Sequence, residues 1–392
     1  MTENSQRADS VNQSPTFGDD VEFLKKYGDI IVLQDSSGEG RLAVSAALQG
    51  RVMTSTSDGD RGLSYGWINR NAFISGDTSE HFNPYGGEDR IWLGPEGGQY
   101  SIYFSKGKEF NLDNWYVPRL IDLEPYDVVG SSRNEAVFTK EAVLTNYSGT
   151  LFNVGLRRTV KVIEKAEALH RLGIQSVPGL SMVAHETINE LKNVGATPWK
   201  KETGLLSIWV LGMFNPSAAA TIIVPYHGSK TSLREIVNDN YFGQVPEDRL
   251  KLVGTTVFFK ADGQYRSKIG MLPENAPPWL GSYDADNGVL TVVKYSKPEN
   301  TRDYVNSLWE IQKEPYRGDA INAYNDGPPA PGVKPMGPFY ELETSSPAAA
   351  LQPNGSIKHV HSTFHFKGSP QQLDPIARKL FGISTSEIVS SF

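Results

Sequence analysis

Residues 337–344 read GPFYELET, and Pro347 follows closely. This pattern predicts a short β-strand that ends at a turn, because aromatic residues favour strands and the flanking Gly-Pro and Ser-Ser-Pro sequences favour turns. Side chains alternate along a strand, so Glu341 and Glu343 point to one face, with about 6.5–7 Å between their backbone positions. Two carboxylates on one face are costly to bury and raise each other's pKa, as in an acid/base pair or a metal-binding pair. The spacing also suits an inverting glycosidase, and the alternative is a solvent-facing strand edge.

The next predicted strand, residues 358–366, carries three of the seven histidines of the chain. Its sequence KHVHSTFHF places His359, His361 and His365 at odd positions, so their rings share one face. Imidazoles in this pattern can ligate a metal or supply a general acid. They can equally belong to a surface strand whose histidines bond to neighbouring groups. We expect neither a bound metal nor another cofactor, and a metal held by these histidines with nearby carboxylates is the minor alternative.

Strand patterns dominate the remainder of the chain. Alternating or β-rich runs occupy residues 30–33, 42–54, 99–104, 156–163, 206–211, 221–226, 252–259, 289–295 and 304–311. Helical signals are few: residues 374–382, with Asp374 as N-cap, Pro375 as first helical residue and Gly382 as C-terminal stop, and more weakly residues 20–27. No GxGxxG sequence, P-loop or repeat of about 20–50 residues is present, so we expect an all-β fold rather than a doubly wound sheet or a propeller.

Composition and charge limit the partners and the compartment. The 392 residues carry a net charge of −7 at pH 7, which disfavours nucleic acid as a ligand because phosphate binding requires clustered Lys and Arg. No run of about 18 apolar residues is present, so we expect no membrane span. The absence of cysteine excludes disulfides, thiolate metal ligands and cysteine nucleophiles. Residues 1–19 are polar and lack a hydrophobic signal core, so we expect a flexible tail there and a single domain over residues 20–392, either cytoplasmic or exported by a signal that was removed.

Three motifs carry a resemblance to a known family. Residues 46–52 read AALQGRV, residues 83–92 read NPYGGEDRIW, and residues 337–344 end in Leu-Glu-Thr ahead of a proline-containing turn. Together, and in this order, they resemble the aldose 1-epimerases of the galactose mutarotase-like superfamily. The resemblance implies a galactose mutarotase-like β-supersandwich with few short helices and a saccharide ligand. It also implies that Glu343 is the general base that takes the proton from the anomeric hydroxyl of the sugar.

The general acid of this family has no counterpart at the matching position. The epimerases carry a histidine in a central strand segment, whereas the comparable segments here, residues 211–216 (LGMFNP) and 238–242 (NDNYF), contain none. Mutarotation needs an acid at the ring oxygen while the base works at O1. The resemblance is therefore to a divergent branch of the superfamily, in which Glu341 or the histidine strand, through His361, supplies the acid.

Candidate ligand-binding residues lie mainly in Gly-rich and Pro-rich stretches. Gly86 and Gly87 let the backbone approach a ligand or bend sharply. Planar rings stack on the C–H faces of sugars and charged groups pair with sugar hydroxyls. On these grounds we expect contributions from Glu88, Arg90, Trp92, Trp279, His359 and His365. The alternative for each is structural: a turn held by an Asp–Arg pair, a tryptophan packed in the core, or a bonded histidine.

The sequence leaves two main functions open. The first is a carbohydrate-active enzyme, epimerase-like or glycan-processing, with Glu343 as base. The second is a non-catalytic carbohydrate-binding protein that kept the fold and lost the chemistry. A metal-dependent hydrolase that uses the histidine strand is a weaker third.

Overall fold

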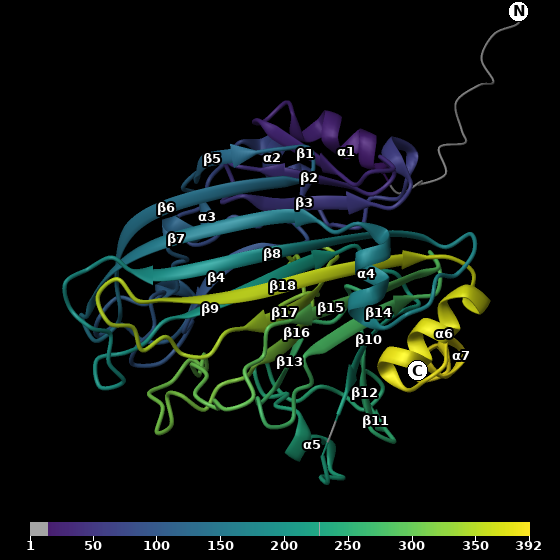
Figure 1. Ribbon diagram of the computed structural model, residues 1–392. Coiled ribbons are helices and arrows are strands. Elements are labelled where there is room, and N and C mark those ends of the chain that lie inside the picture. The colour runs from purple at the N-terminus through teal and green to yellow at the C-terminus, as the bar shows by residue number, and fades with distance from the viewer. Residues whose placement is uncertain (1–14, 227) are drawn as a thin grey trace, which may run out of the picture.

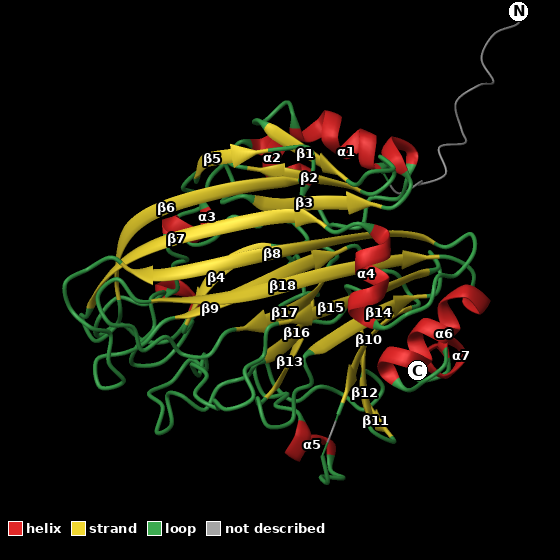
Figure 2. Cartoon of the chain, in the orientation of Figure 1, coloured by secondary structure: helices red, strands yellow, loops and turns green. Residues whose placement is uncertain are grey.

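The computed structural model describes residues 15–226 and 228–392, which form three antiparallel sheets with a few short helices (Figure 1, Figure 2). This confirms the predicted all-β class. Residues 1–14 of the expected tail lie outside the described residues. Helix α1 (Phe17–Leu24) begins inside the segment expected to be a tail, because Thr16 caps it and Phe17 is buried. No helix in the described ranges is long and apolar enough to cross a membrane.

The large sheet has ten strands. In spatial order these are β11 (Leu250–Val253), β12 (Thr256–Lys260), β10 (Ala220–Pro225), β14 (Trp279–Asp284), β15 (Val289–Tyr295), β18 (Ser356–Lys367), β8 (Ser181–Asn193), β7 (Leu151–Val162), β6 (Glu135–Thr145) and β5 (Asp127–Ser131). One face of the large sheet is buried in the core, as β7 illustrates. In this strand Phe152, Val154 and Leu156 are buried and alternate with more exposed residues.

The small sheet has five strands. In spatial order they are β13 (Ser267–Met271), β16 (Ile321–Asn325), β17 (Tyr340–Ser345), β9 (Ser207–Phe214) and β4 (Arg90–Gly94). One face packs on the large sheet, and residues such as Ile91, Leu93 and Val210 enter the same hydrophobic core as Leu156 of β7. The other face of this sheet is free to carry a site.

The third sheet contains β1 (Ile30–Gln34), β2 (Arg41–Ser45) and β3 (Arg51–Thr56). The β-rich run predicted over residues 42–54 covers β2 and β3, and a turn divides it at Gly50. Gln49 and Gly50 both have φ of +64° in this turn, and a Cβ on Gly50 would lie 2.5 Å from the ring of Phe138. Only glycine fits at that point.

The remaining helices are short, apart from one near the C-terminal end. They are η1 (Gly59–Arg61), α2 (Arg70–Ser75), η2 (Leu112–Asn114), α3 (Arg119–Asp122), α4 (Lys165–Leu172), α5 (Leu233–Ile236), α6 (Pro370–Phe381) and α7 (Thr385–Val389). Gly382 ends α6 in the left-handed conformation, as predicted. The predicted start was wrong, because Ser369 forms the capping box and Asp374 lies inside the helix, bonded to Arg378 and Thr385.

Two predicted strands are loops, and a third is a hairpin. Residues 99–104 form turns, and residues 304–311 contribute only an isolated bridge at Tyr304. Their aromatic content reflects burial rather than sheet pairing, since Tyr103 and Tyr304 are both buried. Residues 252–259 span the turn between β11 and β12.

Candidate functional site

The outer face of the small sheet carries both glutamates of β17. Thr344 faces the large sheet, because its hydroxyl lies 2.8 Å from Nε2 of His359 in β18. Alternate residues share a face, so Glu341 and Glu343 point the opposite way. In the register, Glu343 lies beside Leu211 of β9, and Leu211 lies beside Arg90 of β4. The predicted shared face of the two glutamates is therefore present.

A cavity of about 460 Å³ lies over this face, and we call it the site cavity. Its walls are mainly apolar and include the rings of four tryptophans: Trp92, Trp115, Trp209 and Trp309. Its titratable lining comprises Arg90, Glu96, Arg266, Lys268 and Glu341, together with Tyr241 and Tyr324. Aromatic faces and charged groups thus converge on one hollow.

Two ion pairs hold the glutamates. Glu341 Oε1 accepts a hydrogen bond from Nη2 of Arg90, and both side chains are nearly buried. Glu343 Oε2 accepts from Nζ of Lys268 at 3.0 Å and from Nε1 of Trp209 at 2.9 Å. The Lys268 ammonium also lies 4.8 Å from the ring centre of Trp209. These charges form pairs rather than a like-charged cluster, which reduces the cost of burying them.

Burial and the neighbouring charges shift the pKa values of Glu341 and Lys268. Burial raises the pKa of Glu341, Arg90 opposes that shift, and the charge of Glu343 adds to it. Burial lowers the pKa of Lys268, but the charges of Glu343, Glu96 and Glu341 outweigh burial and leave that pKa raised. Lys268 is therefore a firmly protonated cation at neutral pH.

Glu96 is a second carboxyl group in the site cavity. It follows β4, and its backbone N–H donates to Oγ of Ser307 at 3.1 Å. Burial raises the pKa of Glu96 to about 7; Lys268 opposes the shift, and Glu343 adds to it. A carboxyl group with this pKa can hold or release a proton near neutral pH.

A small polar void of about 20 Å³ adjoins the site cavity, with Glu96, Trp209, Tyr241 and Lys268 lining both. It has room for about one water molecule. Asp319 lines the void and accepts a hydrogen bond from the Tyr241 hydroxyl. Burial raises the pKa of Asp319 to about 6, although that hydrogen bond opposes the shift. The polar end of the site therefore contains two carboxyl groups with raised pKa values.

Glu343 itself has no exposed surface. Its Oε1 is buried without a hydrogen-bond partner among the described residues, and its Oε2 is covered by Lys268 and Trp209. A ligand in the site cavity therefore reaches Glu343 only if the Lys268 side chain moves.

A family model described as a family of unknown function, DUF6786, matches residues 15–392. The chain belongs to DUF6786. No curated protein matches the sequence of this DUF6786 chain.

Solved structures show what the DUF6786 chain is similar to. One is the Slr1438 protein of Synechocystis sp. PCC 6803, at 14% identity and a TM-score of 0.51, covering 87% of this chain and 96% of that one. A second is a candidate aldose 1-epimerase of Escherichia coli K12, at 11% identity and a TM-score of 0.51, covering 86% and 98%. A third is a candidate mutarotase of Salmonella typhimurium, at 12% identity and a TM-score of 0.50, covering 87% and 91%. The DUF6786 chain therefore has the galactose mutarotase-like β-sandwich fold.

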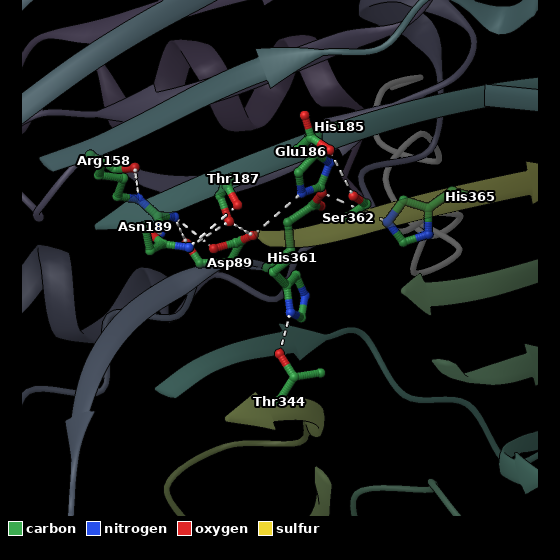
Figure 3. Close-up of polar contacts among 12 residues, drawn as sticks. Asp89, Arg158, His185, Glu186, Thr187, Asn189, Thr344, His361, Ser362 and His365 are labelled. Carbon is green, nitrogen blue, oxygen red and sulfur yellow. Dashed lines mark hydrogen bonds and ion pairs between the residues drawn. The ribbon is translucent and has the colours of Figure 1, made fainter. Parts of the chain in front are cut away.

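The histidine strand of the DUF6786 chain faces the core rather than the site cavity. Nδ1 of His361 lies 2.8 Å from Oγ1 of Thr344 (Figure 3). Nε2 of His359 lies 2.8 Å from the same Oγ1 atom, and both rings are fully buried. Because Thr344 and Glu343 point to opposite faces of β17, the sheet itself separates His361 from the site cavity. This corrects the expectation that His361 supplies the acid and that His359 contacts a ligand.

These histidines belong to a larger group between the two sheets, which we call the inter-sheet cluster. Its members are all buried and comprise Glu88, Asp89, Arg158, His185, Thr187, Asn189, Thr344, His359, His361 and His365. Arg158 pairs with Asp89 at 2.6 Å and donates to Oδ1 of Asn189 at 2.6 Å (Figure 3). Within the described ranges, no group of three or more His, Asp and Glu side chains is arranged to hold a metal ion.

Glu88 and His365 are also inside the inter-sheet cluster. Glu88 Oε1 lies 3.7 Å from Nε2 of His365, whose ring stacks on Tyr65 with centroids 4.3 Å apart. Gly86 and Gly87 precede the cluster with φ of +94° and +117°, and a Cβ on Gly87 would lie 2.6 Å from the Arg51 side chain. The glycines bend the chain against other protein groups, and none of these four residues lines the site cavity.

The two predicted tryptophans have different places. Trp92 lines the site cavity, with its ring 5.6 Å from that of Trp209. Trp279 begins β14 and donates from Nε1 to the carbonyl of Leu380 in α6 at 2.9 Å, so it packs against a helix. Of the candidates from the sequence, the cavity lining includes Arg90, Trp92 and Glu341, with Glu343 directly behind it.

Sequence reasoning missed much of the site. Lys268, Trp209, Tyr241, Arg266 and Trp309 come from separate strands and loops, and only the pairing of β9, β17, β16 and β13 brings the first two to Glu343. Trp209 occupies an alternating position in a predicted strand, which was the one available signal. Glu96 was not among the predicted site residues.

Proposed function

We propose that this protein binds a saccharide in the site cavity and carries out epimerase-like acid/base chemistry on it. The supporting observation is the meeting of four tryptophan rings with the Arg90–Glu341 and Lys268–Glu343 pairs over one sheet face. Aromatic rings stack on the C–H faces of a pyranose, and charged side chains bond its hydroxyls. The volume of about 460 Å³ falls within the range of about 300–1,000 Å³ for small-molecule sites.

In this proposal Glu343 is the base and Glu96 the acid. Glu343 takes the proton of the anomeric hydroxyl, the bond between C1 and the ring oxygen breaks, and Glu96 gives a proton to that oxygen. Reclosure on the other face of C1 returns both protons. A pKa of about 7 suits Glu96 to this role, because a general acid is most effective when its pKa lies near the ambient pH. The likeness to a candidate aldose 1-epimerase supports this class of chemistry.

A non-catalytic carbohydrate-binding protein is the second candidate. The full burial of Glu343 behind Lys268 and Trp209 favours it, because a base must reach its proton. The two candidates differ in whether ligand binding displaces the Lys268 ammonium from Glu343.

One experiment separates the two candidates. Binding of a panel of aldoses is measured by tryptophan fluorescence and calorimetry, and interconversion of their anomers by NMR, for wild type, Glu343→Gln and Glu96→Gln. We expect wild type to accelerate anomer exchange and both variants to lose it while binding is retained. Binding without turnover by wild type indicates the non-catalytic protein. An absence of binding to every sugar contradicts both candidates.

A further inference from the structure

Three cations line the site cavity, and only two of them are neutralised. Arg90 pairs with Glu341, and Lys268 pairs with Glu343. Across residues 15–226 and 228–392, Arg266 forms no ion pair, and its guanidinium instead lies 3.9 Å from the ring centre of Phe242. The unpaired cation is therefore Arg266.

The contact with Phe242 holds the Arg266 side chain in place at the site cavity. Both residues line the site cavity; Phe242 is 44% exposed, and Arg266 is half-buried. A guanidinium that stacks on a ring keeps the N–H groups of its edge free. Stacking also restricts the side chain before a ligand arrives, which lowers the entropic cost of binding.

No carboxylate among the described residues forms an ion pair with this cation. The nearby Asp326 is already satisfied, since it accepts from the Tyr324 hydroxyl at 2.8 Å and from the Gly337 N–H at 2.9 Å. Glu96 also lines the cavity, but burial raises its pKa to about 7, so it carries only part of a negative charge near neutral pH. Among the side chains that line the cavity, the three cations Arg90, Arg266 and Lys268 outnumber the two carboxyl groups Glu96 and Glu341, although the chain as a whole carries a net charge of −7.

We infer that the ligand is an anionic saccharide, a sugar that bears a carboxylate or a phosphate, and that Arg266 binds its charged group. The planar guanidinium matches either group with two parallel N–H donors. The tryptophan rings and the two ion pairs are then available to contact the C–H faces and the hydroxyls of the sugar ring. This inference rests on the proposed function, because it names the class of saccharide that the same cavity takes.

The test compares matched neutral and acidic sugars. Calorimetry measures the binding of glucose, glucuronate, galactose, galacturonate and glucose 6-phosphate to wild type, Arg266→Gln and Arg157→Gln at low and high salt. Arg157 is the control because it is exposed on β7, away from the site cavity. We expect the acidic sugars to bind wild type at least about tenfold more tightly than the neutral ones, as one charge-assisted pair allows, with the difference reduced by salt.

Arg266→Gln is expected to remove this preference, because it weakens the binding of acidic sugars more than that of neutral sugars, whereas Arg157→Gln behaves as wild type. The larger preference, for the uronates or for the phosphate, identifies the charged group. Equal affinity of wild type for neutral and acidic sugars overturns the inference and leaves the proposed function standing. A preference that survives in Arg266→Gln overturns the role of Arg266. An absence of binding to every sugar overturns the proposed function as well.

Discussion

The site cavity and the inter-sheet cluster lie on opposite faces of the small sheet, and both contain paired charged residues. Glu343 and Thr344 are neighbours in the chain, yet one supports the cavity and the other bonds to the buried histidines. The cavity is open on one side, so a ligand or water can replace the partners of its charges. The cluster is closed on all sides, so each charge there depends on a protein partner. The same residue types therefore serve two purposes according to the face from which they project.

The largest expected effect is on stability, from Arg158→Met in the inter-sheet cluster. This change leaves Asp89 as a fully buried carboxylate without its cation, and removing one partner of a buried pair typically lowers the free energy of unfolding by about 3–5 kcal/mol. Urea unfolding measures the change. The control is Arg157→Met, the exposed neighbour, for which we expect a change within about 0.5 kcal/mol.

If Arg158→Met does not fold while Arg157→Met does, this result also supports the prediction, because it reflects a large loss of unfolding free energy. Equal effects of the two substitutions would contradict the contrast between the closed cluster and the open surface. The double variant Asp89→Asn/Arg158→Met is expected to recover part of the loss, because it leaves no unpaired charge.

The second prediction concerns pH. Burial lowers the pKa of His359 from 6.5 to about 3 and that of His361 from 6.5 to about 4. Between these values and 6.5 the unfolded chain binds protons that the folded chain does not. The two histidines therefore do not reduce the free energy of unfolding above pH 6.5. As the pH falls from 6.5 toward 4, they lower the free energy of unfolding by an amount on the order of a few kcal/mol.

Urea unfolding between pH 7.5 and pH 4.5 tests this prediction, by comparing wild type with His361→Asn. The raised pKa values of Glu96 and Asp319 act in the opposite direction, so the difference between the two proteins isolates the histidine. We expect the variant to lose less stability than wild type on acidification, and His170→Asn, exposed on α4, to follow wild type. An identical pH dependence in wild type and His361→Asn would show that His361 is not held neutral by burial.

The smallest expected effect is on the cavity side. Trp209→Phe keeps an aromatic wall and removes the N–H that Glu343 Oε2 accepts at 2.9 Å. A lost hydrogen bond to a charged group costs about 1.5–3 kcal/mol of unfolding free energy, and the Lys268 ammonium still bonds to Glu343 Oε2 in this variant. Thermal unfolding measures this cost, and calorimetry should show weaker saccharide binding at the same time. A stability loss as large as that of Arg158→Met would mean that the cavity is as closed as the cluster.

The sequence predicted the fold better than it predicted the site. Strand-rich patterning predicted the all-β class, because alternation and turn residues are local properties. The resemblance of three motifs to the aldose 1-epimerases implied the galactose mutarotase-like sandwich. The shared face of Glu341 and Glu343 followed from the same alternation. Which way that face points is not local, since it depends on how β17 packs against β18. The histidines were therefore placed with Glu343 although they project to the other side.

The cavity lining shows the same limit. Lys268 and Trp209 reach Glu343 only through the strand order β13-β16-β17-β9, and nothing near them in the sequence indicates that order. Trp279 was a candidate because prolines flank it, but α6 covers its ring edge. Burial and cross-strand register, rather than residue type, decide which of these side chains meet a ligand.

The most direct test of the central claim is a crystal structure of the protein with the tightest-binding saccharide of the panel. We predict that the sugar lies in the site cavity, stacked on at least one of the four tryptophan rings and within hydrogen-bond distance of Glu341 or Glu343. A sugar bound elsewhere on the protein, or a cavity that holds only water at a saturating concentration of sugar, would contradict the account.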